Sequence, residues 1–306
     1  VHSEIYVDKT GLIGYCNHVI NTMQRYICVS RPRRFGKSMA ANMLSAYYSR
    51  ECDSEKLFEG LEISKGSGFK KHLNQYDTIF LNMQEFLSRS GNVDKLIDRI
   101  KKLVIRELKA EHPDVDYFDD TDLVDIYREK KIPFVVIIDE WDCIFREYKQ
   151  DKEAQEKYLD FLRDLLKDKG YIHLAYMTGI LPIKKYGTHS ALNMFDEFSM
   201  ISPGPLASYV GFTETEVEAL CRQYKADMSE VKSWYDGYSF EKEKSIYSPR
   251  SVVNCMRFEK IENYWNQTET FEALQFYIDM NFDGLKDDVL SMIAGESVPV
   301  NTGSFT

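Results

Sequence analysis

The stretch ICVSRPRRFGKS, residues 27–38, constrains the fold of this chain more than any other stretch. An apolar run over 26–29 breaks at residues 30–32, and a Gly-Lys-Ser triplet then opens a segment of helical character over 39–48. A strand, a loop and a helix in this order place backbone N–H groups and a helix N-terminus around bound phosphate. The stretch therefore predicts a phosphate-binding loop, or P-loop.

Each residue of the triplet has its own expected role. Gly36 lets the backbone approach the phosphates, Lys37 brings positive charge to the β- and γ-phosphates, and Ser38 can bind Mg²⁺. The full motif also has a glycine five residues before Gly36, where this chain has Arg31. The triplet alone is a short signal, so a basic surface turn after a strand is the alternative interpretation.

A second motif, FVVIIDEWD at residues 134–142, favours the nucleotide interpretation. Four β-branched residues, 135–138, predict a strand that is buried on both faces. Carboxylates that end a buried strand are costly unless a cation lies there. In P-loop enzymes the first acid, here Asp139, holds the Mg²⁺ shell, and the second, Glu140, orients and deprotonates the attacking water. An acidic first turn of a helix is the alternative, but the two motifs follow the order that these enzymes use.

The composition argues against several other classes of protein. The 306 residues are 43% hydrophobic and 29% charged, which is typical of a globular chain with a sizeable core. A net charge of −10 argues against a non-specific nucleic-acid binder. The six cysteines form no CxxC pair, which predicts reduced thiols in a cytoplasmic protein, with neither zinc nor disulfides. No apolar run predicts a membrane span or signal peptide. Because the chain starts at Val1 without a methionine, we expect a fragment of a longer protein.

The pattern between and after the two motifs alternates strands with helices. Strands are predicted over 77–83 and 172–177, a loop over 183–200, and helices over 12–23, 93–109, 122–130 and 158–169. Thr178 directly follows the predicted strand 172–177, at a position where P-loop ATPases place a sensor of the γ-phosphate. The Thr-Gly pair also commonly ends strands, and this alternative stays open.

From Gly211 onward the chain changes to short helices. Thr213 and Glu216 form a capping-box pattern, and further helices are predicted over 229–238 and 251–258. This part is expected to form a lid over the nucleotide. Its aromatic residues predict either a base-stacking surface or the core of a small helical domain, and the scarcity of basic residues among them favours a core. They are Trp234, Tyr235, Tyr238, Phe240, Tyr247, Tyr264 and Trp265.

These motifs together resemble those of the predicted AAA-ATPase-like family of bacteria. The resemblance rests on SRPRRFGKS, VVIIDEWD, YMTGI, GFTETEV, WYDGYSF and IYSPRSV, with YVDKT at the start. It implies an α/β fold: a P-loop NTPase three-layer sandwich with a parallel central sheet and one additional strand, then a smaller helical lid. The implied domains are a core at 1–210, a lid at 211–290, and at 291–306 the start of a missing nuclease-like domain of the PD-(D/E)xK type.

The same resemblance implies which residues form the site. The implied nucleotide ligands are Arg33, Arg34, Phe35, Gly36, Lys37, Ser38 and Met39. Ser38 and Asp139 are the implied metal ligands, and Glu140, Lys37 and Thr178 the implied catalytic residues. Arg31 in place of the first glycine departs from the general P-loop pattern, although it is normal in this family.

The leading hypothesis is a Mg²⁺-dependent ATPase whose hydrolysis of ATP moves the lid and any appended effector. The alternative is a regulatory switch or interaction module that binds nucleotide and hydrolyses little of it, with a protein partner or self-association. Nucleic acid enters only through the missing C-terminal domain, by family analogy.

Overall fold

The computed structural model describes residues 4–114, 133–183, 192–200, 202–238, 245–264 and 285–298. Within them lies a parallel five-stranded sheet in the order β2-β3-β4-β1-β5. Its strands are β1 (Tyr26–Ser30), β2 (Asp77–Asn82), β3 (Phe134–Asp139), β4 (Ile172–Gly179) and β5 (Asp196–Phe198). Because β4 lies between β1 and β3, one additional strand separates the P-loop strand from the acidic strand, as the resemblance implied.

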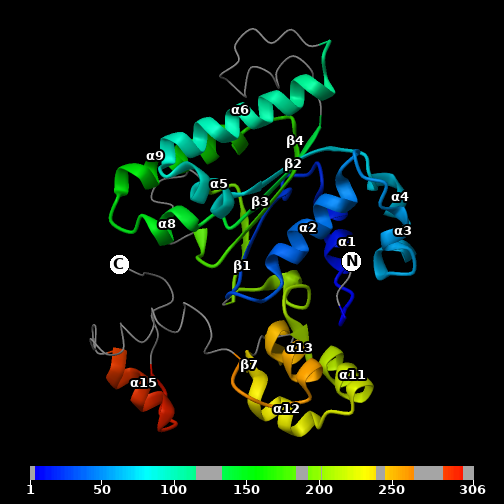
Figure 1. The fold of residues 1–306 in the computed structure, drawn as a ribbon, viewed down its shortest axis with the longest axis vertical. Helices are drawn as coiled ribbons and strands as arrows, with labels where there is room; N and C mark the ends of the chain where they lie inside the picture. The colour runs from blue at the N-terminus through cyan, green and yellow to red at the C-terminus, as the bar shows by residue number, and fades with distance from the viewer. Residues whose placement is uncertain are drawn as a thin grey trace.

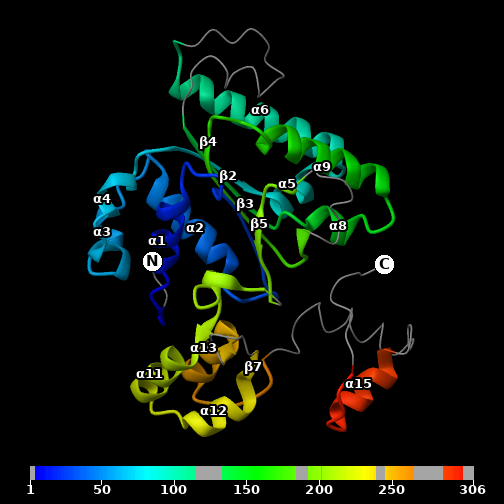
Figure 2. The same ribbon diagram turned by 180° about the vertical axis from the view of Figure 1, so that it is seen from behind.

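Helices cover both faces of the sheet, which confirms the predicted three-layer α/β sandwich (Figures 1 and 2). One face packs against α1 (Gly11–Val19) and α2 (Lys37–Tyr48), with α3 (Glu55–Phe58), η1 (Glu62–Lys65) and α4 (Phe69–His72) beside them. The other packs against α5 (Met83–Ser90), α6 (Val93–Glu111), α8 (Cys143–Glu147) and α9 (Lys152–Leu166).

Strand β3 explains why the sheet is buried on both sides. Val135 and Ile137 belong to the core on the α2 face, whereas Val136 and Ile138 belong to the core on the α6 face. Alternating side chains of one strand thus fill both cores. An uninterrupted apolar run is what such a strand requires.

The structure differs from the sequence prediction at the edge of the sheet. Residues 183–200 were predicted as a loop, but β5 lies within them and pairs in parallel with β1. A three-residue strand with the sequence Asp-Glu-Phe has no apolar run to reveal it. The predicted helix at 122–130 lies outside the described residues.

The second part of the chain combines helices with a small antiparallel sheet, which the sequence analysis did not predict. Its elements are β6 (Phe212–Thr213), α11 (Glu214–Tyr224), α12 (Met228–Tyr235), β7 (Asp236–Tyr238), β8 (Ile246–Tyr247) and α13 (Pro249–Phe258). The capping box of Thr213 and Glu216 is present at the start of α11, as predicted. We call residues 211–264 the lid. Outside it are η2 (Gly204–Leu206) and α15 (Leu285–Ile293).

The aromatic cluster of the lid is mainly a core, as the sequence favoured. Tyr235, Tyr247 and Tyr264 are buried in the hydrophobic cluster of the lid. Trp234 and Tyr238 are partly exposed, at 46% and 38%. Phe240 and Trp265 lie outside the described residues.

The N-terminal segment, residues 4–9, joins the lid to the sheet domain. Ile5 is buried in the lid cluster and Val7 packs against it. The ammonium group of Lys9 donates to the carbonyl of Ser208 at 2.6 Å and to the Glu216 carboxylate at 2.6 and 2.7 Å. Residues 4–9 therefore contact the lid before α1 enters the sheet domain. None of the helices that the structure describes is both long and apolar enough to cross a membrane.

Candidate functional site

The carboxyl ends of β1, β3 and β4 bring the predicted site residues to one edge of the sheet. Ser30 pairs with Gly179, and Ile138 pairs with Met177, so the three strands end at nearly the same level. The P-loop follows β1, Asp139 ends β3, and Thr178 lies at the end of β4. In parallel α/β sheets, ligands bind outside the carboxyl ends of the strands.

The P-loop enters α2 through a left-handed turn. Gly36 has a φ of 89°, and a Cβ there would meet no atom within 4 Å, so the backbone conformation and not space requires the glycine. Lys37 is 4% exposed, and its Nζ donates to the carbonyl of Pro32 at 2.9 Å across the loop. Ser38 and Met39, on the first turn of α2, are exposed. The ammonium group is thus held on the loop side of the helix N-terminus.

Arg31 occupies the position where the general motif has its first glycine, and its side chain is buried in the protein interior. It is 1% exposed, and one of its terminal nitrogens donates to the carbonyls of Ser30 at 3.0 Å and Phe198 at 2.7 Å. Burial lowers the pKa of Arg31 to about 10. The guanidinium therefore ties the end of β5 to the start of the P-loop.

Asp139 offers a buried carboxylate oxygen to a cation. Its Oδ1 accepts from the Thr178 hydroxyl at 2.5 Å and from the Glu140 N–H at 3.1 Å. Its Oδ2 is buried and has no hydrogen-bond partner in the described structure. A buried carboxylate oxygen without a partner is costly, and a hard cation such as Mg²⁺ would satisfy it. Among the described residues, no three His, Cys, Asp or Glu side chains are placed so that together they could hold a metal ion.

Glu140, which follows Asp139, forms an ion pair with Arg146 that the sequence pattern does not predict. Its Oε2 accepts from the Arg146 guanidinium at 2.5 Å, and Arg146 also donates to Gln84 Oε1 at 3.3 Å. Glu140 has a φ of 56°, a left-handed conformation that costs about 1 kcal/mol or more for a residue other than glycine. The Glu140 carboxylate thus extends from a left-handed backbone and is held by the guanidinium of Arg146.

Lys37 and the acidic strand end influence each other electrostatically. Burial lowers the pKa of Lys37, while the negative charges of Glu140, Asp142 and Asp139 raise it. Burial likewise raises the pKa of Glu140, against the opposing effect of Arg146 and Lys37. Lys37 is thus close enough to the acidic strand end for their charges to influence one another.

Asp142 stabilises this edge of the sheet by accepting hydrogen bonds from the backbone after β4. It is fully buried, and its Oδ2 accepts from the N–H groups of Ile180 at 3.1 Å and Leu181 at 2.9 Å. Gly179 is required beside it, because a Cβ there would lie 2.5 Å from the Trp141 indole nitrogen. Asp142 was visible in the FVVIIDEWD motif, but only the folded chain reveals its partners at the end of β4.

The P-loop also contacts the lid. The Phe35 ring is 3% exposed and packs edge-to-face on Tyr238 of β7, with 5.3 Å between ring centroids. A Cβ added to Gly211, which has a φ of 113°, would lie 3.3 Å from the Phe35 ring. Burial lowers the pKa of Arg34, and repulsion by the nearby cation of Arg250 on α13 lowers it further. Phe35 therefore acts as a contact to the lid, in addition to its place among the predicted nucleotide ligands.

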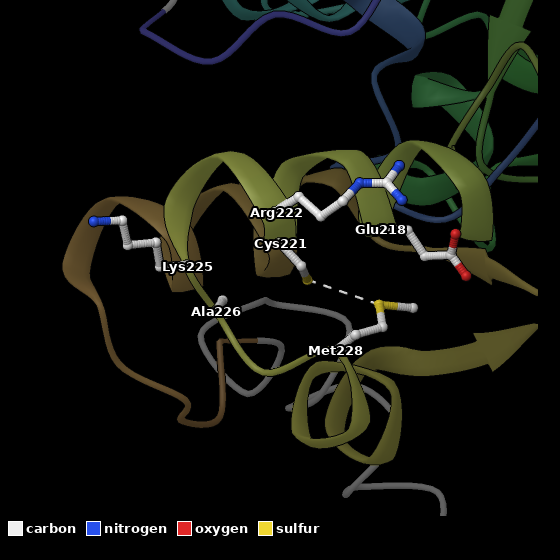
Figure 3. A pocket seen from close by; sticks show the side chains of 6 residues that line it. All are labelled: Glu218, Cys221, Arg222, Lys225, Ala226 and Met228. Atoms are coloured by element: carbon white, nitrogen blue, oxygen red, sulfur yellow. Dashed lines mark hydrogen bonds between the residues drawn. The ribbon is translucent and has the colours of Figure 1, made fainter.

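A separate hollow of 570 Å³ lies on the lid surface between α11 and the start of α12 (Figure 3). The Cys221 thiol donates to the Met228 sulfur at 3.7 Å there. Glu218, Arg222 and Lys225 surround this contact. None of the predicted site residues lines the hollow, so it is not the P-loop site.

Several known proteins are similar to this chain. The chain is 24% identical over 278 residues to an uncharacterized protein in the vnfD 5' region of Azotobacter chroococcum mcd 1; the match covers 87% of the chain, which spans about half (51%) of that relative. Two solved structures are distantly similar, each at 11% identity. The Aeropyrum pernix ORC2 protein in ADPNP-ADP complexes has a TM-score of 0.39, with 98% of this chain and 80% of that chain covered. Stu0660 of Streptococcus thermophilus has a TM-score of 0.29, with 83% and 94% covered.

These TM-scores are low, so the fold assignment depends on the strand order and the site described above. The profile of the predicted AAA-ATPase family matches residues 2–188, which include β1 to β4, the P-loop and the acidic strand end. The chain therefore belongs to the predicted AAA-ATPase family.

Proposed function

We propose that this protein binds ATP together with Mg²⁺ at the P-loop and hydrolyses it. The observation that carries the proposal is that a buried lysine, Lys37, lies close enough to Asp139 for their charges to interact, and that the buried Asp139 carboxylate has one oxygen without a hydrogen-bond partner in the described structure. A triphosphate needs cations on its phosphates and an acid for its metal, and both are present here. ATP in preference to GTP rests on the family assignment.

The roles of the chain's own groups follow from their positions. Lys37 neutralises charge on the β- and γ-phosphates, and the P-loop N–H groups before α2 hold them in place. Glu140 accepts a proton from the attacking water, and Thr178 orients Asp139 through its hydroxyl. The Ser38 hydroxyl and Asp139 Oδ2 would hold Mg²⁺, which when bound neutralises phosphate charge. Arg33 and Arg34 add positive charge within the loop.

Coupling to the lid belongs to the same proposal. Phe35 lies between two P-loop residues, Arg34 and Gly36, and its ring packs on Tyr238 of the lid. A change of the loop around phosphate would shift this ring, and close-packed contacts transmit such shifts. Nucleotide binding and hydrolysis are therefore proposed to alter how the lid sits on the loop.

Two substitutions separate binding from hydrolysis. Lys37→Ala is expected to weaken ATP binding at least tenfold, because it leaves phosphate charge without its buried partner. Glu140→Gln is expected to retain ATP binding and to lower kcat by about a hundredfold or more, because the amide cannot accept the proton. Titration with a fluorescent ATP analogue and steady-state phosphate release measure the two effects. Equal ATP affinity in Lys37→Ala and the unsubstituted protein would overturn the assignment.

A second candidate function is a nucleotide-binding switch that hydrolyses little ATP. The ion pair of Glu140 with Arg146 favours it, because a carboxylate engaged by a guanidinium is a poorer base. Steady-state phosphate release distinguishes the two functions. Tight binding with a turnover that Glu140→Gln does not lower further would support the switch, whereas turnover that depends on Glu140 supports the ATPase.

A further inference from the structure

A groove of 870 Å³ lies beside β2, the outer strand of the sheet in the part of the chain that the structure describes, and none of the site residues lines it. It runs between α5, α6 and the outer strand β2, which Figure 1 shows beside one another. We define this basic groove by its five cationic residues. They are Arg89, Lys95, Arg99, Lys102 and Arg106.

Three of these cations have no ion-pair or hydrogen-bond partner for their side chains in the part of the chain that the structure describes. Arg89 is paired with Glu85 at 2.7 Å, and Arg99 donates to the Arg89 carbonyl at 3.2 Å. The side chains of Lys95, Lys102 and Arg106 make no such contact and are exposed along one side of α6. Glu85 and Asp98 are the acidic residues of the lining, so the five cations exceed the two acids there by three.

This excess of positive charge contrasts with the rest of the chain. The whole protein has a net charge of −10. Clustered cations on an acidic protein raise the local concentration of anionic partners and give them a preferred docking position. The charge of the basic groove thus selects a ligand with several negative charges.

The remaining lining argues for a polypeptide as that ligand. Phe80, Phe86 and Leu103 are half-buried and give the groove apolar contact area between its cations. Phe80 and Asn82 come from β2, which pairs with β3 on one side and is the outer strand of the sheet. An outer strand offers backbone N–H and C=O groups to an added strand, and alternating side-chain contacts then provide specificity.

We propose that the basic groove binds an acidic, extended polypeptide segment of a partner protein, which adds to β2 as a strand. Carboxylates of the segment pair with Lys95, Lys102 and Arg106 on the α6 side, and its alternate apolar side chains contact Phe80, which packs on the opposite face of the sheet. Because no residue of the nucleotide site lines the groove, the proposal does not depend on ATP hydrolysis.

A fluorescein-labelled peptide of alternating glutamate and valine tests the proposal by fluorescence anisotropy. We expect it to bind with an affinity that falls as salt rises. Lys95→Glu/Lys102→Glu/Arg106→Glu should weaken binding by about tenfold or more. Lys56→Glu/Lys149→Glu/Lys152→Glu makes the same change in net charge at exposed lysines outside the groove, and should bind like the unsubstituted protein.

Further binding measurements distinguish strand addition, nucleic-acid binding and dependence on the nucleotide site. A peptide with methylated backbone nitrogens should bind several-fold more weakly, because it cannot donate to the β2 edge; equal binding overturns strand addition. Equal losses in both triple variants, or no peptide binding at all, overturn the groove as the site. Groove-dependent binding of labelled oligo(dT) without peptide binding would assign it to nucleic acid instead. Lys37→Ala should keep peptide binding, which separates this outcome from failure of the proposed ATPase.

Discussion

At the scale of single residues, the environment of Glu140 governs how the proposed base behaves. Burial raises the pKa of its carboxyl, and the guanidinium of Arg146 and the ammonium of Lys37 oppose that rise. A carboxyl with a raised pKa takes up its proton at a higher pH than an ordinary glutamate. Hydrolysis that needs the carboxylate should therefore decline as the pH falls through that raised value.

Replacement of Arg146 tests this balance. Arg146→Met removes a cation that favours the charged form of Glu140, so the acidic limb of the kcat profile should move to higher pH. Since the pair is largely buried, the free energy of unfolding should also fall by about 1–3 kcal/mol. Stopped assays of phosphate release across pH and urea titration measure the two effects.

Arg146→Lys is the matched variant, because it keeps the positive charge and loses the planar fork. Its acidic limb should lie near that of the unsubstituted protein. If Arg146→Met left the pH profile unchanged while Glu140→Gln abolished turnover, Arg146 would have no influence on the base.

At the scale of elements, the P-loop and the lid strand β7 meet through the Phe35 ring. Its burial and its edge-to-face contact with Tyr238 connect the loop that we propose contacts phosphate to strand β7 of the lid. Gly211 permits this approach, since any side chain there would collide with Ile246 at 2.7 Å. The contact is thus formed by two aromatic rings, and one glycine makes room for it.

Phe35→Ala should both destabilise the protein and weaken its response to nucleotide. Loss of a buried ring costs about 3 kcal/mol, and the loop loses the contact that orders it against the lid. Isothermal titration with ATP and hydrogen exchange of β7 with and without nucleotide measure the outcome. Tyr238→Phe, which keeps the ring, should resemble the unsubstituted protein. ATP-dependent protection of β7 that persists in Phe35→Ala would contradict the coupling.

At the scale of the whole molecule, the N-terminal segment fastens the lid. Lys9 reaches Ser208 and Glu216, and Glu216 also accepts from the Thr213 N–H at 2.7 Å in the capping box. One carboxylate therefore serves both the start of α11 and a contact between residues about 200 positions apart. The segment and the lid are joined although the sheet domain separates them in sequence.

Lys9→Met should loosen this connection. The variant leaves the Glu216 carboxylate largely buried without its ammonium partner, so we expect a loss of about 1–3 kcal/mol in unfolding free energy. Chymotrypsin should also cleave faster near residues 208–213, where Tyr209 and Phe212 provide its cleavage sites. Lys232→Met breaks the exposed pair with Glu214 within the lid and should change stability little. Equal behaviour of the two variants would show that the Lys9 contact does not fasten the lid.

Much of the fold could be predicted from the sequence because apolar runs and motif order carry it. The run 134–138 and the Gly-Lys-Ser triplet indicated a parallel sheet with a phosphate loop, and Thr178 was placed at a neighbouring strand end. The strand β5 and the lid sheet have only two or three residues per strand, too few for a periodic pattern. The boundaries at residues 210 and 290, and the roles assigned to the site residues, stay predictions.

The sequence by itself determined the local chemistry: a glycine where the backbone is left-handed, a lysine at a helix start, and two acids at a buried strand end. Only the tertiary structure decided which groups these would meet. Arg31 turns inward to Phe198, Arg146 holds Glu140, and Phe35 inserts toward the lid. The physical reason is that such partners lie on separate elements, and sequence spacing does not reveal which side chains packing will bring within a few ångströms.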